Sequence, residues 1–137
     1  MTWSDGAKRS AAVAMAAAIA APAEGLRRYA YYDPPGILTV CRGHTGPDVV
    51  KGKKYSLAEC DKFFDADMRL AIAQVDRCVP GLPDEVLASF GDAVYNMGPK
   101  IACDTVRSTA ARMLKAGRLK EACNELPKWN KANVAGF

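Results

Sequence analysis

Apolar residues recur every three to four positions after residue 56, a spacing that predicts amphipathic helices. The clearest helix begins at Ser56, where Ser56 and Glu59 have the spacing of a capping box, and stops near Pro80-Gly81. Its apolar positions are Leu57, Cys60, Phe64, Met68, Ala71, Val75 and Val79. We expect them to form one face of a long helix that packs on a core.

Turn and capping residues divide the remaining C-terminal part into three more helices. One is expected to start at Pro83-Asp84 and end at Gly98-Pro99. The next spans Asp104 to Lys115, with Gly117 as its stop signal, and a short one spans Leu119 to Leu126. We interpret their apolar stripes as core and assign them no cofactor role.

The region from Leu26 to Val50 has a different pattern, rich in Tyr, Pro and Gly. Within it, Ile37-Leu38-Thr39-Val40-Cys41 predicts a strand flanked by turns, while Gly46-Pro47-Asp48 and Lys51-Gly52-Lys53-Lys54 predict loops. A small β-lobe of hairpins is the natural result. The predicted fold class is therefore α+β, with a small β-hairpin lobe joined by a long helix to a mainly helical lobe.

Length and composition fit one globular domain: the chain has 137 residues, of which half are hydrophobic and a quarter are charged. Its 19 basic and 15 acidic residues give a net charge of +4. This excess fits a mildly basic soluble protein, and it would also favour an anionic partner such as a bacterial envelope. We identify no Lys/Arg cluster with interleaved aromatic residues, so no nucleic-acid partner is expected.

Five cysteines, at positions 41, 60, 78, 103 and 123, are many for this length. No C-x-x-C pair occurs and there is one histidine, so a Cys/His zinc site is not expected. In an oxidising compartment some cysteines would pair as disulfides, although the sequence does not give the pairing. Alternatively they are small buried hydrophobic residues, because Cys60 and Cys78 fall on the apolar side of the long helix.

Glu24, Asp33 and Thr39 carry the most chemical information in the chain. Two carboxylates and a hydroxyl this close in sequence can converge on one cleft, and hydrolysis of a glycosidic bond needs a pair of carboxyl groups. Each residue also has an ordinary explanation. Glu24 would be an exposed carboxylate at a helix end, Asp33 a turn former before proline, and Thr39 a β-branched residue in a strand.

The stretch from Ala23 to Gly46 resembles the phage-type lysozymes, the endolysins of glycoside hydrolase family twenty-four. That family carries a Glu, Asp and Thr triad at this spacing, followed by a Gly-His pair, which here is Gly43-His44. The resemblance continues through SLAECDKFFDADM, FGDAVYNMG and STAARMLKAG. It therefore covers nearly the whole chain from Glu24 onward.

The resemblance implies roles for the candidate site residues. Glu24 would be the general acid, while Asp33 and Thr39 would hold the attacking water, as in an inverting enzyme. The distance between the two carboxyl groups, which the sequence does not give, decides between inversion and retention. His44 and Asp67 would form a structural ion pair between the β-lobe and the long helix.

The same resemblance extends to substrate binding and cofactors. Asn96 lies in a segment that lines the substrate cleft in the family, and we expect it to bind substrate, for example through an N-acetyl group. No metal ion or organic cofactor is implied, because two carboxyl groups suffice for the reaction.

The implied activity is that of an endolysin muramidase, which hydrolyses the β-1,4 bond between N-acetylmuramic acid and N-acetylglucosamine in peptidoglycan and so lyses the bacterial host. The expected partner is peptidoglycan, the expected location is the host periplasm, and the expected state is a monomer. Two alternatives remain open: a lytic transglycosylase, and a catalytically weak peptidoglycan-binding remnant. Asp33 and Thr39 argue against the transglycosylase, whose route needs no pair to position water.

The N-terminal segment has fourteen uncharged residues between Arg9 and Glu24, nine of them Ala. It is expected to be the first helix of the domain, or to resemble the signal-arrest-release segments of some endolysins, which associate transiently with the membrane. Signal-peptide cleavage after Ala23 would remove the support of Glu24, so we expect none.

We therefore expect one lysozyme-like domain over residues 1–137. Its parts are the Ala-rich segment 1–23, a β-lobe with the active site over 24–55, and a helical lobe over 56–137.

Relatives in the family carry further chain after the region of Trp129, including an Arg that pairs with the catalytic Glu. The helical lobe is thus expected to be C-terminally short, and if the chain ends at Phe137, lower stability and lower activity are expected to follow.

Overall fold

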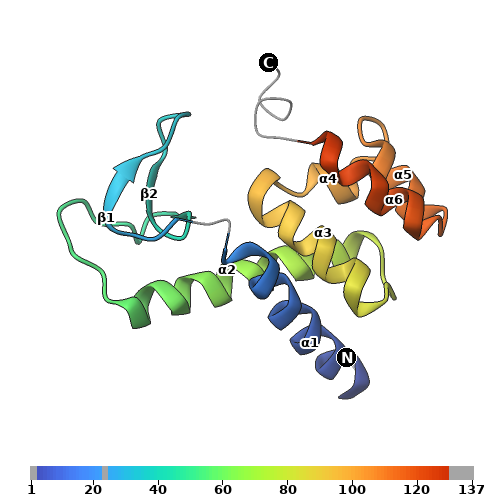
Figure 1. The fold of residues 1–137 in the computed structure, drawn as a ribbon, viewed down its shortest axis with the longest axis horizontal. Helices are drawn as coiled ribbons and strands as arrows, with labels where there is room; N and C mark the ends of the chain where they lie inside the picture. Colours follow the sequence, from blue (N-terminus) through green and yellow to red (C-terminus); the bar gives the residue numbers. More distant parts are fainter. Residues whose placement is uncertain (1–2, 23–24, 130–137) are drawn as a thin grey trace.

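A small antiparallel sheet and a larger group of helices form two lobes, which one long helix joins (Figure 1). The computed structural model describes residues 3–22 and 25–129. The helices in these residues are α1 (Trp3–Ala20), α2 (Leu57–Cys78), α3 (Asp84–Met97), α4 (Lys100–Cys103), α5 (Thr109–Lys115), α6 (Leu119–Glu125) and the 3-10 helix η1 (Leu126–Lys128). The fold is α+β and mainly helical.

The β-lobe is built on three antiparallel strands in the order β1-β2-β3. They are β1 (Arg27–Tyr32), β2 (Leu38–Cys41) and β3 (His44–Thr45). Tyr31 lies opposite Thr39, and Val40 lies opposite His44. The predicted strand over 37–41 is confirmed, with its start one residue later. A separate small core of Val40, Cys41, Val49, Tyr55 and Cys60 holds this lobe together.

Helix α2 begins with the predicted capping box. The Ser56 hydroxyl accepts from the Glu59 N–H, and the Glu59 carboxylate accepts from the Ser56 N–H, both at 3.0 Å. These bonds satisfy two of the free N–H groups at the helix start. The buried face of α2 consists of Cys60, Phe64, Met68, Ala71, Ile72 and Val75. Because α2 runs from the β-lobe into the helical lobe, it fixes the position of both (Figure 1).

The Ala-rich segment is helix α1, which packs on α2 and α3. Its buried positions are Ala12, Val13, Ala16 and Ala20. The approach between these helices is close at Gly91 of α3, where a Cβ atom would lie 2.2 Å from Cδ1 of Ile72 and 3.8 Å from Cβ of Ala16. Over residues 3–22 and 25–129, none of the helices combines the length and the apolar character needed to cross a membrane.

The prediction of one helix over 104–115 is wrong. Helix α4 ends at Cys103, and the carboxylate of Asp104 then accepts hydrogen bonds from two N–H groups of the following turn, at 3.0 and 3.1 Å. Ser108, fully buried, caps α5 by accepting from the Ala111 N–H. Asp and Ser side chains compete with helical hydrogen bonding in this way, so the predicted segment begins with a turn and only Thr109–Lys115 of it is helix α5, whereas α4, just before it, was not predicted.

Two disulfides fix the two ends of α2. Cys41 of β2 is bonded to Cys60 in the first turns of α2, and Cys78 at the end of α2 is bonded to Cys103 of α4. Cys123 is the free cysteine, and burial raises its pKa. The expectation that some cysteines pair is confirmed, and the alternative of merely buried thiols is wrong for Cys60 and Cys78.

Candidate active site

The hairpin between β1 and β2 brings Asp33 and Thr39 to the two sides of one residue, Ile37. The Asp33 carboxylate accepts from the Ile37 N–H at 2.7 Å, and the Thr39 hydroxyl donates to the Ile37 carbonyl at 2.9 Å. Thr39 is 3% exposed and Asp33 is partly buried. With its proton committed to the carbonyl, the Thr39 oxygen is left to accept a hydrogen bond, for example from water.

Glu24, the predicted general acid, lies outside the described residues. In sequence it falls between the end of α1 at Ala20 and the start of β1 at Arg27.

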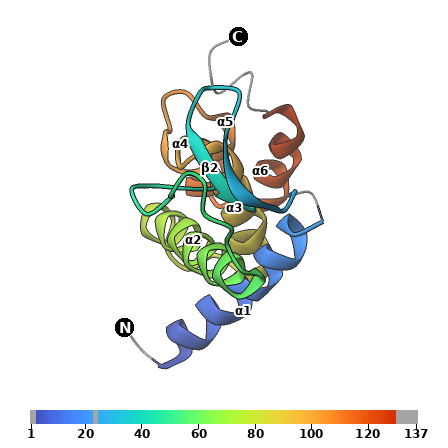
Figure 2. The ribbon, with the colours of Figure 1, turned by 90° about the vertical axis from the view of Figure 1, so that its left-hand side faces the viewer.

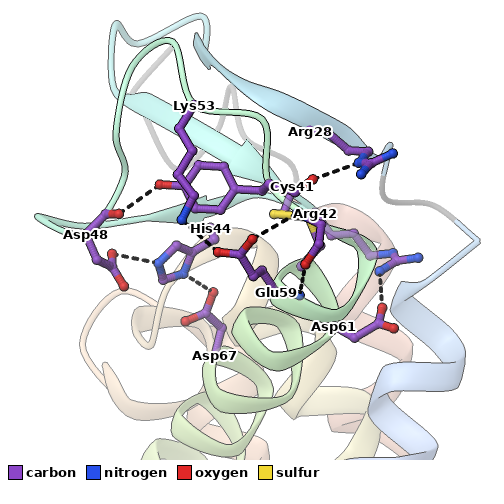
Figure 3. The surroundings of a disulfide bond; sticks show 12 residues. Arg28, Cys41, Arg42, His44, Asp48, Lys53, Glu59, Asp61 and Asp67 are labelled. Carbon is purple, nitrogen blue, oxygen red and sulfur yellow. Dashed lines mark hydrogen bonds and ion pairs between the residues drawn. A yellow bond between two sulfur atoms is a disulfide. The ribbon is translucent and has the colours of Figure 1, made fainter.

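His44 is held between two carboxylates (Figure 3). Its Nδ1 lies 2.7 Å from Oδ2 of Asp67, on α2, and its Nε2 lies 2.8 Å from Oδ1 of Asp48. The imidazole stacks on the ring of Phe63, with centroids 3.9 Å apart and planes 4° apart. Burial alone lowers the pKa of His44, but the hydrogen bonds and charges of Asp67 and Asp48 outweigh it, so the pKa is raised.

Three further links join the β-lobe to the first half of α2. They are the Cys41–Cys60 disulfide and the ion pairs Arg42–Asp61 and Lys53–Glu59, each with a 2.8 Å contact (Figure 3). The two ion pairs are largely exposed and contribute little individually. Together with the His44 contacts, the links hold the hairpin in one orientation on α2.

A cavity of about 250 Å³ lies where the β-lobe meets the helical lobe. Its lining comes from the β2–β3 turn, β3, α2 and α3: Gly43, Thr45, Asp67, Leu70, Ala71, Gln74, Val94 and Tyr95. The Tyr95 hydroxyl donates to the carbonyl of Arg42, so the last turn of α3 contacts the β-lobe directly at this point. Both polar and apolar groups line the cavity.

The Asn96 side chain is fixed by Asp92, one helical turn earlier. Its Nδ2 donates to the backbone carbonyl of Asp92 at 3.0 Å and to the Asp92 carboxylate at 3.1 Å. Both partners accept only, so the amide must turn its NH₂ group towards them and its oxygen away. Asn96 can therefore offer an acceptor to a ligand. Burial raises the pKa of Asp92, although its bond to Asn96 opposes the shift.

Sequence reasoning missed Asp48 and Asp92. Asp48 stands four residues after His44, in a segment predicted only as a loop, so nothing local marks it as a second partner for the imidazole. Asp92 could have been found, because positions i and i+4 of a predicted helix lie on one face and Asn96 was already a candidate. Over residues 3–22 and 25–129, His, Cys, Asp and Glu side chains form no group of three or more suited to a metal ion.

Comparison with known proteins places these residues in a family. The sequence model of the family described as Phage lysozyme matches residues 21–136, a range that includes Glu24, Asp33, Thr39, His44 and Asn96. This chain belongs to the phage lysozyme family. It is 36% identical over 110 residues to a SAR-endolysin of Bacteriophage PS119, in an alignment that covers 80% of this chain. The chain spans 64% of the length of that relative.

Solved structures show the same fold. The active form of the P1 phage endolysin Lyz matches with a TM-score of 0.72 and 21% identity, over 84% of this chain and 70% of that one. The muramidase domain of SpmX from Asticaccaulis excentricus matches with a TM-score of 0.69 and 22% identity, over 87% and 76% of the two chains. The fold of this family member is therefore lysozyme-like, as predicted.

Proposed function

We propose that this chain is an endolysin muramidase, which hydrolyses the β-1,4 bond between N-acetylmuramic acid and N-acetylglucosamine in peptidoglycan. The observation that carries the proposal is the match of the phage lysozyme family to residues 21–136, together with the hairpin that brings Asp33 and Thr39 together. The names of the SAR-endolysin relative and of the SpmX muramidase domain support it further.

In the proposed reaction, Glu24 protonates the oxygen of the leaving sugar. A water molecule attacks the anomeric carbon from the opposite face, held by the Asp33 carboxylate and the Thr39 oxygen, and the product has inverted configuration. The free acceptor capacity of Thr39 supports this role, because its hydroxyl proton already binds the Ile37 carbonyl. Asp33 accepts the proton that the water loses.

We propose that the glycan lies along the junction of the two lobes, beside the cavity. Asn96, whose oxygen points away from Asp92, would accept a hydrogen bond from the N–H of an acetamido group. His44 and Asp67 would act as a structural pair that holds the β-lobe on α2, with no part in proton transfer. The active site would thus belong to residues 24–55 and the glycan support to the helices of 56–137, in one domain.

The proposed place of action is the host periplasm, which agrees with the two disulfides, because such bonds persist in oxidising compartments. The proposed state is a monomer. The Ala-rich segment would associate transiently with the membrane before it packs as α1.

The test is loss of turbidity in Gram-negative cells whose outer membrane has been permeabilised, with wild type and Glu24→Gln compared and the released fragments identified by mass spectrometry. We expect clearing by wild type alone, with reducing-end muropeptides as products. Anhydro-sugar products would instead identify the chain as a lytic transglycosylase. If neither protein clears the cells although both bind peptidoglycan, the chain is a binding remnant.

A further inference from the structure

The net positive charge of the chain is concentrated in the β-lobe. Residues 25–55 contain six Lys or Arg and two Asp, an excess of four, which equals the excess over all 137 residues. The rest of the chain is balanced, with thirteen residues of each sign. An anion that approaches the protein is therefore attracted mainly to this lobe.

Half of these six cations already have partners. Arg42 pairs with Asp61, Lys53 pairs with Glu59, and Nε of Arg28 donates to the carbonyl of Tyr55 at 2.7 Å. The other three are Arg27, Lys51 and Lys54, which form no ion pair within the residues that the structure describes. All three are exposed and remain free to bind an external anion.

The free cations lie next to exposed tyrosines of β1. The segment after Val50 runs antiparallel to β1: Tyr29 lies opposite Lys54 in an isolated bridge, and Nζ of Lys51 lies 5.0 Å from the centroid of the Tyr32 ring. Tyr29 and Tyr32 are 54% and 58% exposed. The chain thus does contain a cluster of cations with interleaved aromatic rings, because folding brings two segments about twenty residues apart into contact.

The same lobe also exposes two aliphatic side chains. Ile37 and Val50 are each 52% exposed, and Val50 directly precedes Lys51. We define the β-lobe face as Tyr29, Tyr32, Ile37, Val50, Lys51 and Lys54. In Figure 2 the β-lobe faces the viewer, in front of the helical lobe, so its outer side is not covered by the described helices.

We propose that the β-lobe face binds the surface of an anionic phospholipid bilayer. Lysine ammonium groups would contact the lipid phosphates, tyrosine rings would lie at the level of the headgroups, and the aliphatic side chains would reach the acyl boundary. A soluble polyanion would use the lysines but would gain nothing from exposed Ile37 and Val50, which is why the bilayer is the better occupant. The inference goes beyond the muramidase activity and does not depend on the N-terminal segment.

The experiment is co-sedimentation of the full chain with vesicles of phosphatidylcholine alone and of phosphatidylcholine mixed with phosphatidylglycerol. Each lysine near an anionic surface strengthens binding about fivefold, so Lys51→Gln/Lys54→Gln should bind the mixed vesicles about 30-fold more weakly. The matched control is Lys115→Gln/Lys120→Gln, an equal loss of charge at exposed positions of the helical lobe. It should bind like wild type.

A second variant, Tyr29→Ser/Val50→Ser, separates a bilayer from a soluble polyanion, because it keeps every charge and lowers only the interfacial contacts. We expect it to bind mixed vesicles more weakly and a soluble polyphosphate as well as wild type does. All variants should keep muropeptide release and cooperative unfolding.

Three results would overturn the proposal. One is wild-type vesicle binding that does not depend on phosphatidylglycerol. Another is an equal loss of vesicle binding in Lys51→Gln/Lys54→Gln and Lys115→Gln/Lys120→Gln, since net charge alone would then determine the affinity. The third is full vesicle binding by Tyr29→Ser/Val50→Ser, which would assign the face to a soluble anionic polymer.

Discussion

The hydroxyl of Tyr95, near the end of α3, donates a hydrogen bond to the backbone carbonyl of Arg42 in the β-lobe. The same ring packs edge-on against Phe64 of α2, with centroids 5.4 Å apart. One side chain of the helical lobe therefore contacts the β-lobe and the connecting helix together. Tyr95 also lines the cavity at the junction between the lobes.

Tyr95→Phe keeps the ring and removes the hydroxyl that binds Arg42. We expect the free energy of unfolding to fall by about 1 kcal/mol, the usual net value of such a hydrogen bond. Urea unfolding measures it, with Tyr29→Phe as the control, because the Tyr29 side chain is 54% exposed. Equal effects in the two variants would show that the contact with Arg42 contributes nothing to stability.

The raised pKa of His44 predicts how stability depends on pH. Because folding favours the protonated imidazole, its contribution is complete below the ordinary pKa of 6.5 and is lost as the pH rises through the higher pKa of the folded protein. Urea unfolding at a series of pH values should show wild-type stability falling above about pH 6.5, and His44→Asn should lack this part of the slope.

The same variant tests the structural assignment of His44. If His44 only holds the β-lobe on α2 through Asp67, His44→Asn should lose activity only as far as it unfolds. A folded His44→Asn protein without muramidase activity would instead make His44 part of the chemistry.

The orientation of Asn96 predicts a difference between two substitutions of Asp92. Asp92→Asn keeps a side-chain acceptor for the Asn96 amide, whereas Asp92→Leu removes it and leaves only the backbone carbonyl of residue 92 to orient the amide. We expect Asp92→Leu to raise KM about fivefold, the value of one hydrogen bond, with little change in kcat. Steady-state kinetics on purified glycan strands measures both constants. An equal rise of KM in Asp92→Asn would mean that the charge of Asp92 matters and the orientation of Asn96 does not.

Removal of the Cys41–Cys60 disulfide should lower the free energy of unfolding by about 3 kcal/mol, because the bond closes a loop of 19 residues. Cys41→Ser/Cys60→Ser should also lose more activity than Cys78→Ser/Cys103→Ser, since Cys41 lies two residues from Thr39. Thermal unfolding and turbidity assays measure the two effects, with Cys123→Ser as the neutral control. Equal activity in the two double variants would show that the bond has no influence on the site.

Gly91→Ala tests the close packing of α3 on α2. The new Cβ atom would lie 2.2 Å from Cδ1 of Ile72, a residue that is 1% exposed and has little room to move. We expect a destabilisation of about 1–3 kcal/mol in chemical unfolding. Gly91→Ala/Ile72→Val, which removes the clashing methyl group, should recover part of this loss. A double variant no more stable than Gly91→Ala would place the strain elsewhere.

Local signals explain which elements the sequence predicted well. The capping box at Ser56 and the stop at Gly98 act within a few residues, so α2 and the end of α3 were correct. The short helix α4 was not predicted, and the start of α5 was placed too early, at Asp104, because Asp104 acts as a turn former there and not as a helix start.

Contacts in the candidate site were predicted less well than the helices, because several of them join segments that lie apart in the sequence. The disulfide partner of Cys41 depends on how the hairpin lies on α2, and the contact of Asp48 with His44 depends on the conformation of the loop after β3; no local sequence pattern encodes either. The roles of Glu24, Asp33, Thr39 and Asn96 stay predictions, and they rest on the family to which the chain belongs.

The two disulfides join cysteines that are consecutive along the chain: the first with the second, and the third with the fourth. A chain that enters an oxidising compartment N-terminus first exposes each cysteine to its correct partner before the next one arrives. Pairing of nearest neighbours therefore gives the native bonds without any reshuffling. Cys123 emerges last, when the other four thiols are already consumed, so it has no wrong partner to capture within its own chain.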